Sequence, residues 1–287
     1  MSHQELLTIG NSFADNALTY LRQIGEPLQF TWTIGRANIG GCPLEKHWNL
    51  HRYSDATPDF VTYNDGAAIG DDPRQGTLRQ MLVAREWDVV TLQQASVDSW
   101  CEEPYRPWLD KLIGLVRELA PQAEILLHHT WAYRSDAPLL AEWQLTTRQM
   151  HERICVVYAD LVAELGLRTL PTGPALQQAR EQGPDGKYEL DAGYNFDQPE
   201  PPALPRQVNN HVIGYWWEAV DTLRGIPELR LDPKHLNVRG CYVASATWFE
   251  TLTGRDVCTS SFCPLGLDEE DQRFLAGVAH DAVVATR

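Results

Sequence analysis

The sequence predicts an α/β protein with a mostly parallel central sheet and helices on both of its faces. Short apolar segments of strand length alternate along the chain with longer segments in which apolar residues recur at helical spacing. Strand-helix-strand repeats of this kind form crossovers between parallel strands. The 287 residues, 43% of them hydrophobic, can bury a core without disulfide or metal cross-links. We therefore expect one domain over residues 1–287, built as a three-layer α/β/α sandwich.

The first part of the chain predicts two strands, each followed by a helix. The strand segments are short and apolar, and after each of them the apolar residues recur every three or four positions. Gly25 and Pro27 end the first helical pattern, and the turn Gly40-Gly41 precedes the second. The expected elements are strands at Leu6–Ile9 and Leu28–Ile34 and helices at Phe13–Ile24 and Leu44–Arg52.

The middle of the chain repeats this alternation. A hairpin is expected over residues 59–70, where an apolar run meets the turn sequence Asn64-Asp65-Gly66. Three further apolar segments complete a five-stranded sheet, and the segments around them have helical spacing. The expected strands are Val89–Leu92, Glu124–His128 and Leu167–Leu170, and the expected helices span about residues 75–84, 105–119, 137–165 and 173–182.

The last third of the chain contains one long segment without a periodic pattern. Gly, Pro, Asp and Asn dominate between about residues 183 and 236, which predicts a long irregular insertion. Helical spacing returns after Asn237 and continues to Leu252, and a last helix is expected over about residues 268–284. Neither a linker between two halves nor an internal repeat is present.

The charge balance argues against two classes of partner. The chain has 39 acidic and 24 basic residues and a net charge of −15, which repels nucleic acid backbones and anionic lipid headgroups. We therefore expect neither nucleic acid nor a membrane as a partner.

The N-terminus lacks the basic and apolar regions of a signal peptide. A full-length chain is expected in the cytoplasm, and one trimmed of a signal peptide in the periplasm or outside the cell.

The six cysteines give no sign of a metal site or a disulfide framework. They are scattered from Cys42 to Cys263 without a Cys-x-x-Cys spacing, which favours free thiols. A metal-dependent hydrolase using His128 or His129 with Asp71-Asp72 is a third class of function, but no His-Glu-x-x-His or comparable ligand spacing is present. We expect neither a metal nor another cofactor.

Polar residues follow the predicted strands at the sheet edge where α/β proteins bind ligands. Ser12 stands between the first strand and the first helix, where a serine can cap the helix or be presented as a nucleophile. Its own N–H would then lie at the positive end of the helix, where it can stabilise an oxyanion. The spacing of Asp232 and His235 can place the carboxylate against one nitrogen of the imidazole ring and leave the other nitrogen for a nucleophile. The alternative is a pair of solvated side chains on a loop.

Other candidates at this edge are the glycine pair Gly40-Gly41 and the glutamine pair Gln93-Gln94. Glycine leaves a backbone N–H uncrowded, although a simple turn has the same composition. Adjacent strand residues point to opposite faces, so we expect one of the two glutamine amides to donate into the crevice. Aromatic side chains near the predicted crevice could stack on sugar rings or pack in the ordinary way; they are Trp100, Trp131, Tyr215, Trp216 and Trp217.

Four sequence blocks resemble the SGNH (GDSL-type) hydrolases, in the order of that superfamily. The blocks are Ile9-Gly10-Asn11-Ser12-Phe13, Asn38-Ile39-Gly40-Gly41, Leu92-Gln93-Gln94-Ala95-Ser96 and Asp232-Pro233-Lys234-His235-Leu236-Asn237. His128–Tyr133 and Cys241–Gly254 resemble a poorly characterised subgroup found beside carbohydrate-degrading genes. The resemblance covers most of the chain except about residues 183–230. It implies the flavodoxin-like SGNH hydrolase fold with a central, mostly parallel five-stranded sheet.

The resemblance implies a serine esterase that works through an acyl-enzyme. Ser12 would be the nucleophile, His235 the general base and Asp232 the carboxylate that orients it. The oxyanion donors would be the N–H of Ser12, that of Gly41 or Gly40, and a side chain of the third block. The superfamily has Gly-x-Asn in that block, where this chain reads Gln94-Ala95-Ser96-Val97, so Gln93 or Gln94 would have to supply the donor.

The resemblance also implies a substrate class. We expect a small-molecule or oligosaccharide ester, in particular an acetyl ester on carbohydrate. Substrate contacts are expected from Asn11, His128 and Trp131, which stand at or shortly after the ends of predicted strands. The alternative is a non-catalytic carbohydrate-binding protein on the same scaffold, which a serine-directed probe would distinguish because it would leave Ser12 unlabelled.

Overall fold

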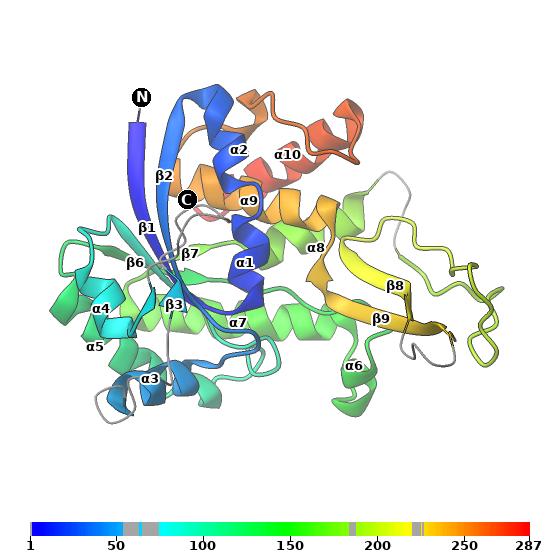
Figure 1. The fold of residues 1–287 in the computed structure, drawn as a ribbon, viewed down its shortest axis with the longest axis horizontal. Coiled ribbons are helices and arrows are strands. Elements are labelled where there is room, and N and C mark those ends of the chain that lie inside the picture. Colours follow the sequence, from blue (N-terminus) through cyan, green and yellow to red (C-terminus); the bar gives the residue numbers. More distant parts are fainter. Residues whose placement is uncertain (1, 54–62, 65–74, 184–187, 220–224, 226) are drawn as a thin grey trace.

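Five parallel strands form the centre of the fold, in the spatial order β2-β1-β5-β6-β7 (Figure 1). They are β1 (Ser2–Gly10), β2 (Phe30–Asn38), β5 (Val89–Leu92), β6 (Glu124–His128) and β7 (Arg168–Leu170). Two short antiparallel strands, β3 (Tyr63–Asn64) and β4 (Gln75–Gly76), extend the sheet beside β2. The predicted α/β class and the five-stranded, mostly parallel sheet are therefore confirmed. The strand order reverses at β1, so the switch point at which such sheets bind ligands lies directly after this strand.

The helices form two layers around this sheet. The structure is a computed structural model, and it describes residues 2–53, 63–64, 75–183, 188–219, 225 and 227–287. One layer packs around α9 (Val238–Thr253), which contacts four other helices: α1 (Ser12–Leu18), α2 (Leu21–Gly25), α8 (Thr172–Gln182) and α10 (Glu269–Val284). In the other layer, α3 (Leu44–Tyr53), α4 (Leu78–Val83) and α5 (Trp108–Leu119) pack on one another. Two more helices, α6 (Pro138–Glu142) and α7 (Thr147–Leu165), precede β7 (Figure 1).

The core lies between the sheet and these helices. All four residues of β5 are buried, as expected of a strand covered on both faces. Among the largest fully buried side chains are Trp87, Trp131 and Trp248. In the described part of the chain, no helix has the length and apolar character that a bilayer crossing requires. All six cysteines are free thiols, as the sequence predicts.

The single long helix predicted over residues 137–165 is wrong, because the segment forms two helices. Gln144 adopts a left-handed backbone conformation with a φ of 55°, which a continuous helix cannot contain. Thr146 then caps α7, accepting from the N–H of Gln149, whose side chain accepts in turn from the Thr146 N–H. The helix predicted over Phe13–Ile24 is likewise divided into α1 and α2.

The irregular insertion predicted over residues 183–236 is also corrected. Its second half is an antiparallel hairpin of β8 (Val212–Ala219) and β9 (Pro227–Leu236), which projects from the sheet (Figure 1). The described residues before it, 188–211, lack regular structure. The base of the hairpin packs on Gly240 of α9, where a Cβ atom would lie 2.1 Å from the carbonyl oxygen of His211. Of the hairpin predicted over residues 59–70, only Tyr63–Asn64 lies within the described residues.

Candidate active site

A cleft of about 430 Å³ opens where β1, β2 and β5 end and β9 passes α1. Its lining comes from all four sequence blocks: Asn11, Ser12, Phe13, Gly40, Gly41, Ala95, Ser96, Val97, Lys234 and His235. Ser12 is the first residue of α1, but Asn11 is its N-cap, and the Asn11 side chain accepts from the N–H of Phe13 at 3.1 Å. The serine is therefore not needed as a cap, and its hydroxyl is available to the cleft.

Three of the predicted residues form a continuous hydrogen-bonded chain. Ser12 Oγ lies 2.8 Å from Nε2 of His235, a residue 223 positions later in the sequence. The other ring nitrogen of His235, Nδ1, lies 2.7 Å from Oδ2 of Asp232. Both distances are normal for strong hydrogen bonds. The structure thus brings together the hydroxyl, the imidazole and the carboxylate that the sequence singled out.

Asp232 is held in its ionised form. Burial raises the pKa of its carboxyl, but hydrogen bonds from the His235 ring and from the backbone N–H groups of His235 and Lys234 outweigh this and lower the pKa to about 2. An ionised carboxylate can only accept, so Nδ1 of His235 carries the proton and Nε2 presents its lone pair to Ser12. In this tautomer, the imidazole can take a proton from the serine hydroxyl.

The segment that carries Asp232 and His235 is anchored on both sides. The indole Nε1 of Trp131 donates to the carbonyl of Lys234 at 2.8 Å, and the N–H of Arg134 donates to that of Pro233 at 2.9 Å. On the side of α1, Asn16 Oδ1 accepts from the N–H of Leu236 at 3.0 Å. These bonds fix the end of β9 against α1, and so they set the distance between the imidazole and the serine.

Backbone N–H groups remain as candidate oxyanion donors. The N–H of Ser12 belongs to the first turn of α1, where such groups have no partner within the helix. Gly40 and Gly41 line the cleft, and Gly41 has a φ of 64°, which explains the choice of glycine there. Asn11 Nδ2 donates to the carbonyl of Cys42 at 3.2 Å and thereby ties this glycine turn to the start of α1.

The prediction that Gln93 or Gln94 donates into the cleft is wrong for this structure. Gln93 Nε2 donates to Asn11 Oδ1 at 2.6 Å, and its Oε1 accepts from His128 Nδ1 at 3.1 Å. Gln94 Nε2 donates to the carbonyl of Pro104, and its Oε1 accepts from two backbone N–H groups. Both side chains are about 1% exposed. In their place, Ala95, Ser96 and Val97 form the wall of the cleft.

The expected substrate contacts from His128 and Trp131 are wrong for this structure, because both residues have an exposed fraction of 0% and neither lines the cleft. Asn11 lines the cleft with an exposed fraction of 2%, and a substrate contact from this residue stays a prediction. Trp131 stacks on Phe13 with ring centroids 3.8 Å apart and donates to the carbonyl of Lys234. His128 supports Gln93, and burial lowers the pKa of His128 to about 3, so its ring is neutral. The other aromatic candidates, Trp100, Tyr215, Trp216 and Trp217, do not line the cleft.

Ser96 and Lys234 line the cleft but were not singled out from the sequence. Ser96 Oγ lies 2.7 Å from the hydroxyl of Tyr133, and Lys234 Nζ lies 5.7 Å from the centre of the Tyr133 ring. Both residues fall inside the blocks that carry the resemblance: Lys234 directly precedes His235, and Ser96 stands two positions after Gln94. Their closeness in the sequence to selected residues could have indicated them, because the sequence neighbours of a reactive residue often line the same cleft.

Replacing Gln93 by Leu is expected to lower the free energy of unfolding by about 1–3 kcal/mol, because His128 Nδ1 and Asn11 lose a buried partner. Equilibrium unfolding in urea measures this change. Gln178→Leu is the control: this half-buried residue of α8 makes only solvent-exposed hydrogen bonds, to Gln182 and Asp281, and the expected change is within about 0.5 kcal/mol. Equal stability of Gln93→Leu and the parent protein would show that the buried chain of side chains contributes nothing.

Among the described residues, one trio could hold a metal ion. Asp256, Cys258 and His280 place one ligand atom each within 4.8 Å of one another, outside the cleft. Of the residues considered for a metal-dependent hydrolase, His128 and His129 are buried with Nδ1 bonded to Gln93 and to the Thr130 carbonyl, respectively. Asp71-Asp72 lie outside the described residues.

Comparisons with known proteins agree with this architecture. Residues 5–198 match the family model described as "Domain of unknown function (DUF4886)". A DUF4886 family protein from Bacteroides uniformis is similar over 99% of this chain and 95% of its own, with 25% identity and a TM-score of 0.74. No curated protein matches the chain.

More distant solved structures are also similar to this chain. A protein from Slackia heliotrinireducens, proposed to be an SGNH hydrolase, matches 88% of this chain and 100% of its own, with 16% identity and a TM-score of 0.51. A proposed GDSL-like lipase from Parabacteroides merdae has 12% identity and a TM-score of 0.47 over 87% of this chain and 95% of its own. The likeness to the Slackia heliotrinireducens protein shows that the fold is that of the SGNH hydrolases, as the sequence resemblance predicts.

Proposed function

The chain belongs to the DUF4886 family, and we propose that it is a serine hydrolase that cleaves carboxylic esters. The proposal rests on the geometry of Ser12, His235 and Asp232. The observation that carries the proposal is the pair of hydrogen bonds of 2.8 and 2.7 Å that joins a hydroxyl, an imidazole and a carboxylate in an open cleft. This arrangement matches the chemical roles of nucleophile, base and orienting group.

The reaction proceeds in two steps. His235 Nε2 accepts the proton of Ser12 as its oxygen attacks the ester carbonyl, and Asp232 stabilises the imidazolium that forms. The N–H groups of Ser12 and of Gly41 or Gly40 stabilise the oxyanion, and the imidazolium returns its proton to the departing alcohol. Water then attacks the acyl-enzyme and gives a proton to His235. The imidazolium passes this proton to the departing oxygen of Ser12, which releases the carboxylic acid and restores the serine hydroxyl.

The acyl group of the proposed substrate is short. The cleft wall near Ser12 is built from Gly40, Gly41, Ala95 and Ser96, whose side chains are small or absent. A volume of about 430 Å³ must hold both the acyl group and part of the alcohol. An acetyl ester meets this condition, whereas a long acyl chain would need an apolar tunnel that the lining residues do not form.

The alcohol part of the proposed substrate is a carbohydrate. This part of the proposal rests on the sequence resemblance to a subgroup found beside carbohydrate-degrading genes, because the aromatic side chains expected to stack on sugars lie outside the cleft. Polar groups at the cleft, including Lys234 and the Ser96 hydroxyl, can hydrogen-bond to sugar hydroxyl groups.

A serine-directed fluorophosphonate tests the proposal directly. We expect one label per chain, located at Ser12 by peptide mass spectrometry, together with hydrolysis of 4-nitrophenyl acetate by the unlabelled protein. His235→Ala should abolish labelling, because the serine then lacks its base. An unlabelled Ser12 in the folded parent protein, with no ester hydrolysis, would contradict the proposal and favour a carbohydrate-binding protein on this scaffold.

A further inference from the structure

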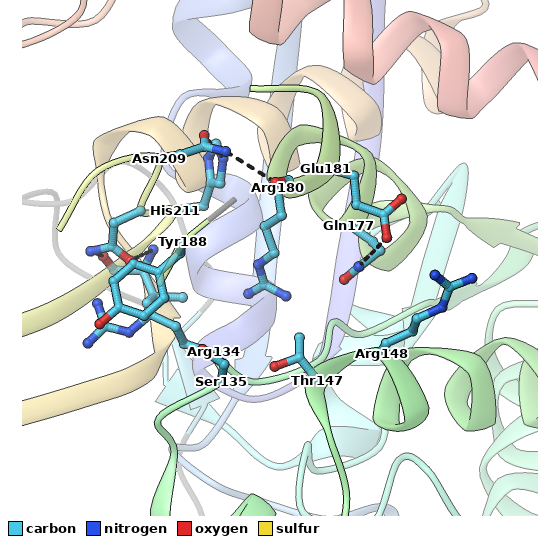
Figure 2. A pocket seen from close by; sticks show the side chains of 12 residues that line it. Arg134, Ser135, Thr147, Arg148, Gln177, Arg180, Glu181, Tyr188, Asn209 and His211 are labelled. Atoms are coloured by element: carbon cyan, nitrogen blue, oxygen red, sulfur yellow. Dashed lines mark hydrogen bonds between the residues drawn. The ribbon is translucent and has the colours of Figure 1, made fainter. Parts of the chain in front are cut away.

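A second cavity, of about 190 Å³, lies beside the N-terminus of α7, with no lining residue in common with the cleft at Ser12. Its walls come from the segment after β6, from α7 and α8, and from the residues before and at the start of β8. Figure 2 shows Arg180 in its centre, with the guanidinium directed toward Thr147 and with Gln177 and Arg148 on one side.

Among the described residues, several polar atoms in these walls are buried and have no hydrogen-bond partner. They include Nη2 of Arg180, Oγ1 of Thr147 and Oε1 of Gln177. Arg180 is partly exposed as a whole residue, but its Nη2 atom has almost no accessible surface. Native proteins leave few buried polar atoms unsatisfied, so four at one cavity, with His211 Nδ1 as the fourth, require an explanation.

The charge of Arg180 is uncompensated, unlike that of its neighbours. Arg134 forms a bidentate ion pair with Asp136, and Arg148 pairs with Glu152. Arg180 Nη1 donates to the carbonyl of Ala132 at 2.8 Å, but no carboxylate within the described residues forms an ion pair with its guanidinium. Burial and the neighbouring Arg134 lower the pKa of Arg180 to about 10, so it stays charged at neutral pH. A buried, unpaired cation is costly, and a bound anion would offset that cost.

Three of these unpartnered atoms define the chemistry of a ligand. Arg180 Nη2 and the Thr147 hydroxyl can donate to an anion, and the first turn of α7 adds a positive partial charge. Gln177 Nε2 donates to Glu181 at 2.9 Å, which leaves its Oε1 as an acceptor for a ligand hydroxyl. Glu181 also lines the cavity, and its charge disfavours a dianion such as phosphate more than a monoanion.

We propose that this cavity binds a small hydroxycarboxylate. The carboxylate accepts from Arg180 Nη2 and Thr147 Oγ1, and the ligand hydroxyl donates to Gln177 Oε1. The volume of about 190 Å³ suits a molecule of the size of glycolate or lactate. The site is separate from Ser12, so this binding does not depend on the proposed hydrolysis.

Calorimetric titration of the whole protein with L-lactate tests the site. We expect saturable binding of lactate, with propionate and inorganic phosphate each weaker by about tenfold or more, because propionate lacks the hydroxyl and phosphate carries more charge. The Ser12→Ala variant should bind lactate as the parent protein does. No binding of lactate, or tighter binding of propionate or phosphate than of lactate, would overturn the proposal.

Two variants locate the binding. Arg180→Met should weaken lactate binding by at least about tenfold, whereas Arg148→Met, at the rim of the same cavity, should change it by less than about twofold. Should Arg180→Met not fold, Thr147→Val keeps the shape of the wall and should still weaken lactate binding by about threefold or more. If the folded Arg180→Met variant binds lactate as tightly as the parent protein, the ligand binds elsewhere. The same conclusion follows from undiminished binding in Thr147→Val, where that variant has to be used instead.

Discussion

Replacing Ser12 by Ala is expected to lower kcat/KM for 4-nitrophenyl acetate by about 10⁴-fold or more, with the fold retained. The variant removes the hydroxyl that is hydrogen-bonded to His235 Nε2 at 2.8 Å, and with it the covalent intermediate. The fold should survive because Asn11, not Ser12, caps α1. Initial rates across a range of substrate concentrations measure the loss, and circular dichroism with thermal unfolding checks the fold.

The matched control is Ser261→Ala, which removes an exposed serine hydroxyl distant in sequence from the four blocks. It should leave kcat/KM unchanged within about twofold. A double variant, Ser12→Ala with His235→Ala, should lose no more activity than Ser12→Ala alone, because the two side chains act as one unit. Turnover of the folded Ser12→Ala variant at the rate of the parent protein would rule out Ser12 as the nucleophile.

The sequence predicts the site better where chemistry depends on residue type than where it depends on side-chain direction. Ser12, Asp232 and His235 were selected by type and spacing, and the structure places them in one hydrogen-bonded chain. Gln93 and Gln94 were selected as donors to the cleft, yet both point into the interior. Their direction follows from partners such as His128 and the N–H of Leu44, which are distant in the sequence, so no local pattern could indicate it.

The fold shows the same division between local and distant causes. The parallel strands were predictable, because a strand buried on both faces is a short apolar run that a local window can detect. The break before α7 depends on one left-handed residue, Gln144, inside a segment that keeps its helical spacing. The strands β8 and β9 were missed because they pair mainly with each other, with several half-exposed residues and little apolar alternation.

Replacing Asp232 by Asn is expected to lower kcat/KM for 4-nitrophenyl acetate by about 10³–10⁴-fold, the second-largest effect predicted here. Asp232 Oδ1 accepts from the backbone N–H groups of Lys234 and His235, and Oδ2 accepts from the His235 ring. An asparagine keeps its single oxygen on the two backbone donors and turns its NH₂ group toward Nδ1. The ring must then carry its proton on Nε2, where it can no longer take the proton of Ser12.

The magnitude of the Asp232→Asn effect separates two roles for the carboxylate. If Asp232 served only to hold the turn before His235, the asparagine oxygen would preserve that role, and activity would fall by less than about tenfold. Glu228→Gln, on the exposed face of the same strand, controls for loss of negative charge and should leave the rate unchanged within about twofold.

Because the pKa of Asp232 is about 2, protonation of this residue should not contribute to any loss of activity between about pH 5 and 8. A large loss in Asp232→Asn that is constant across this pH range therefore reports the tautomer of His235 and not the titration of the carboxylate.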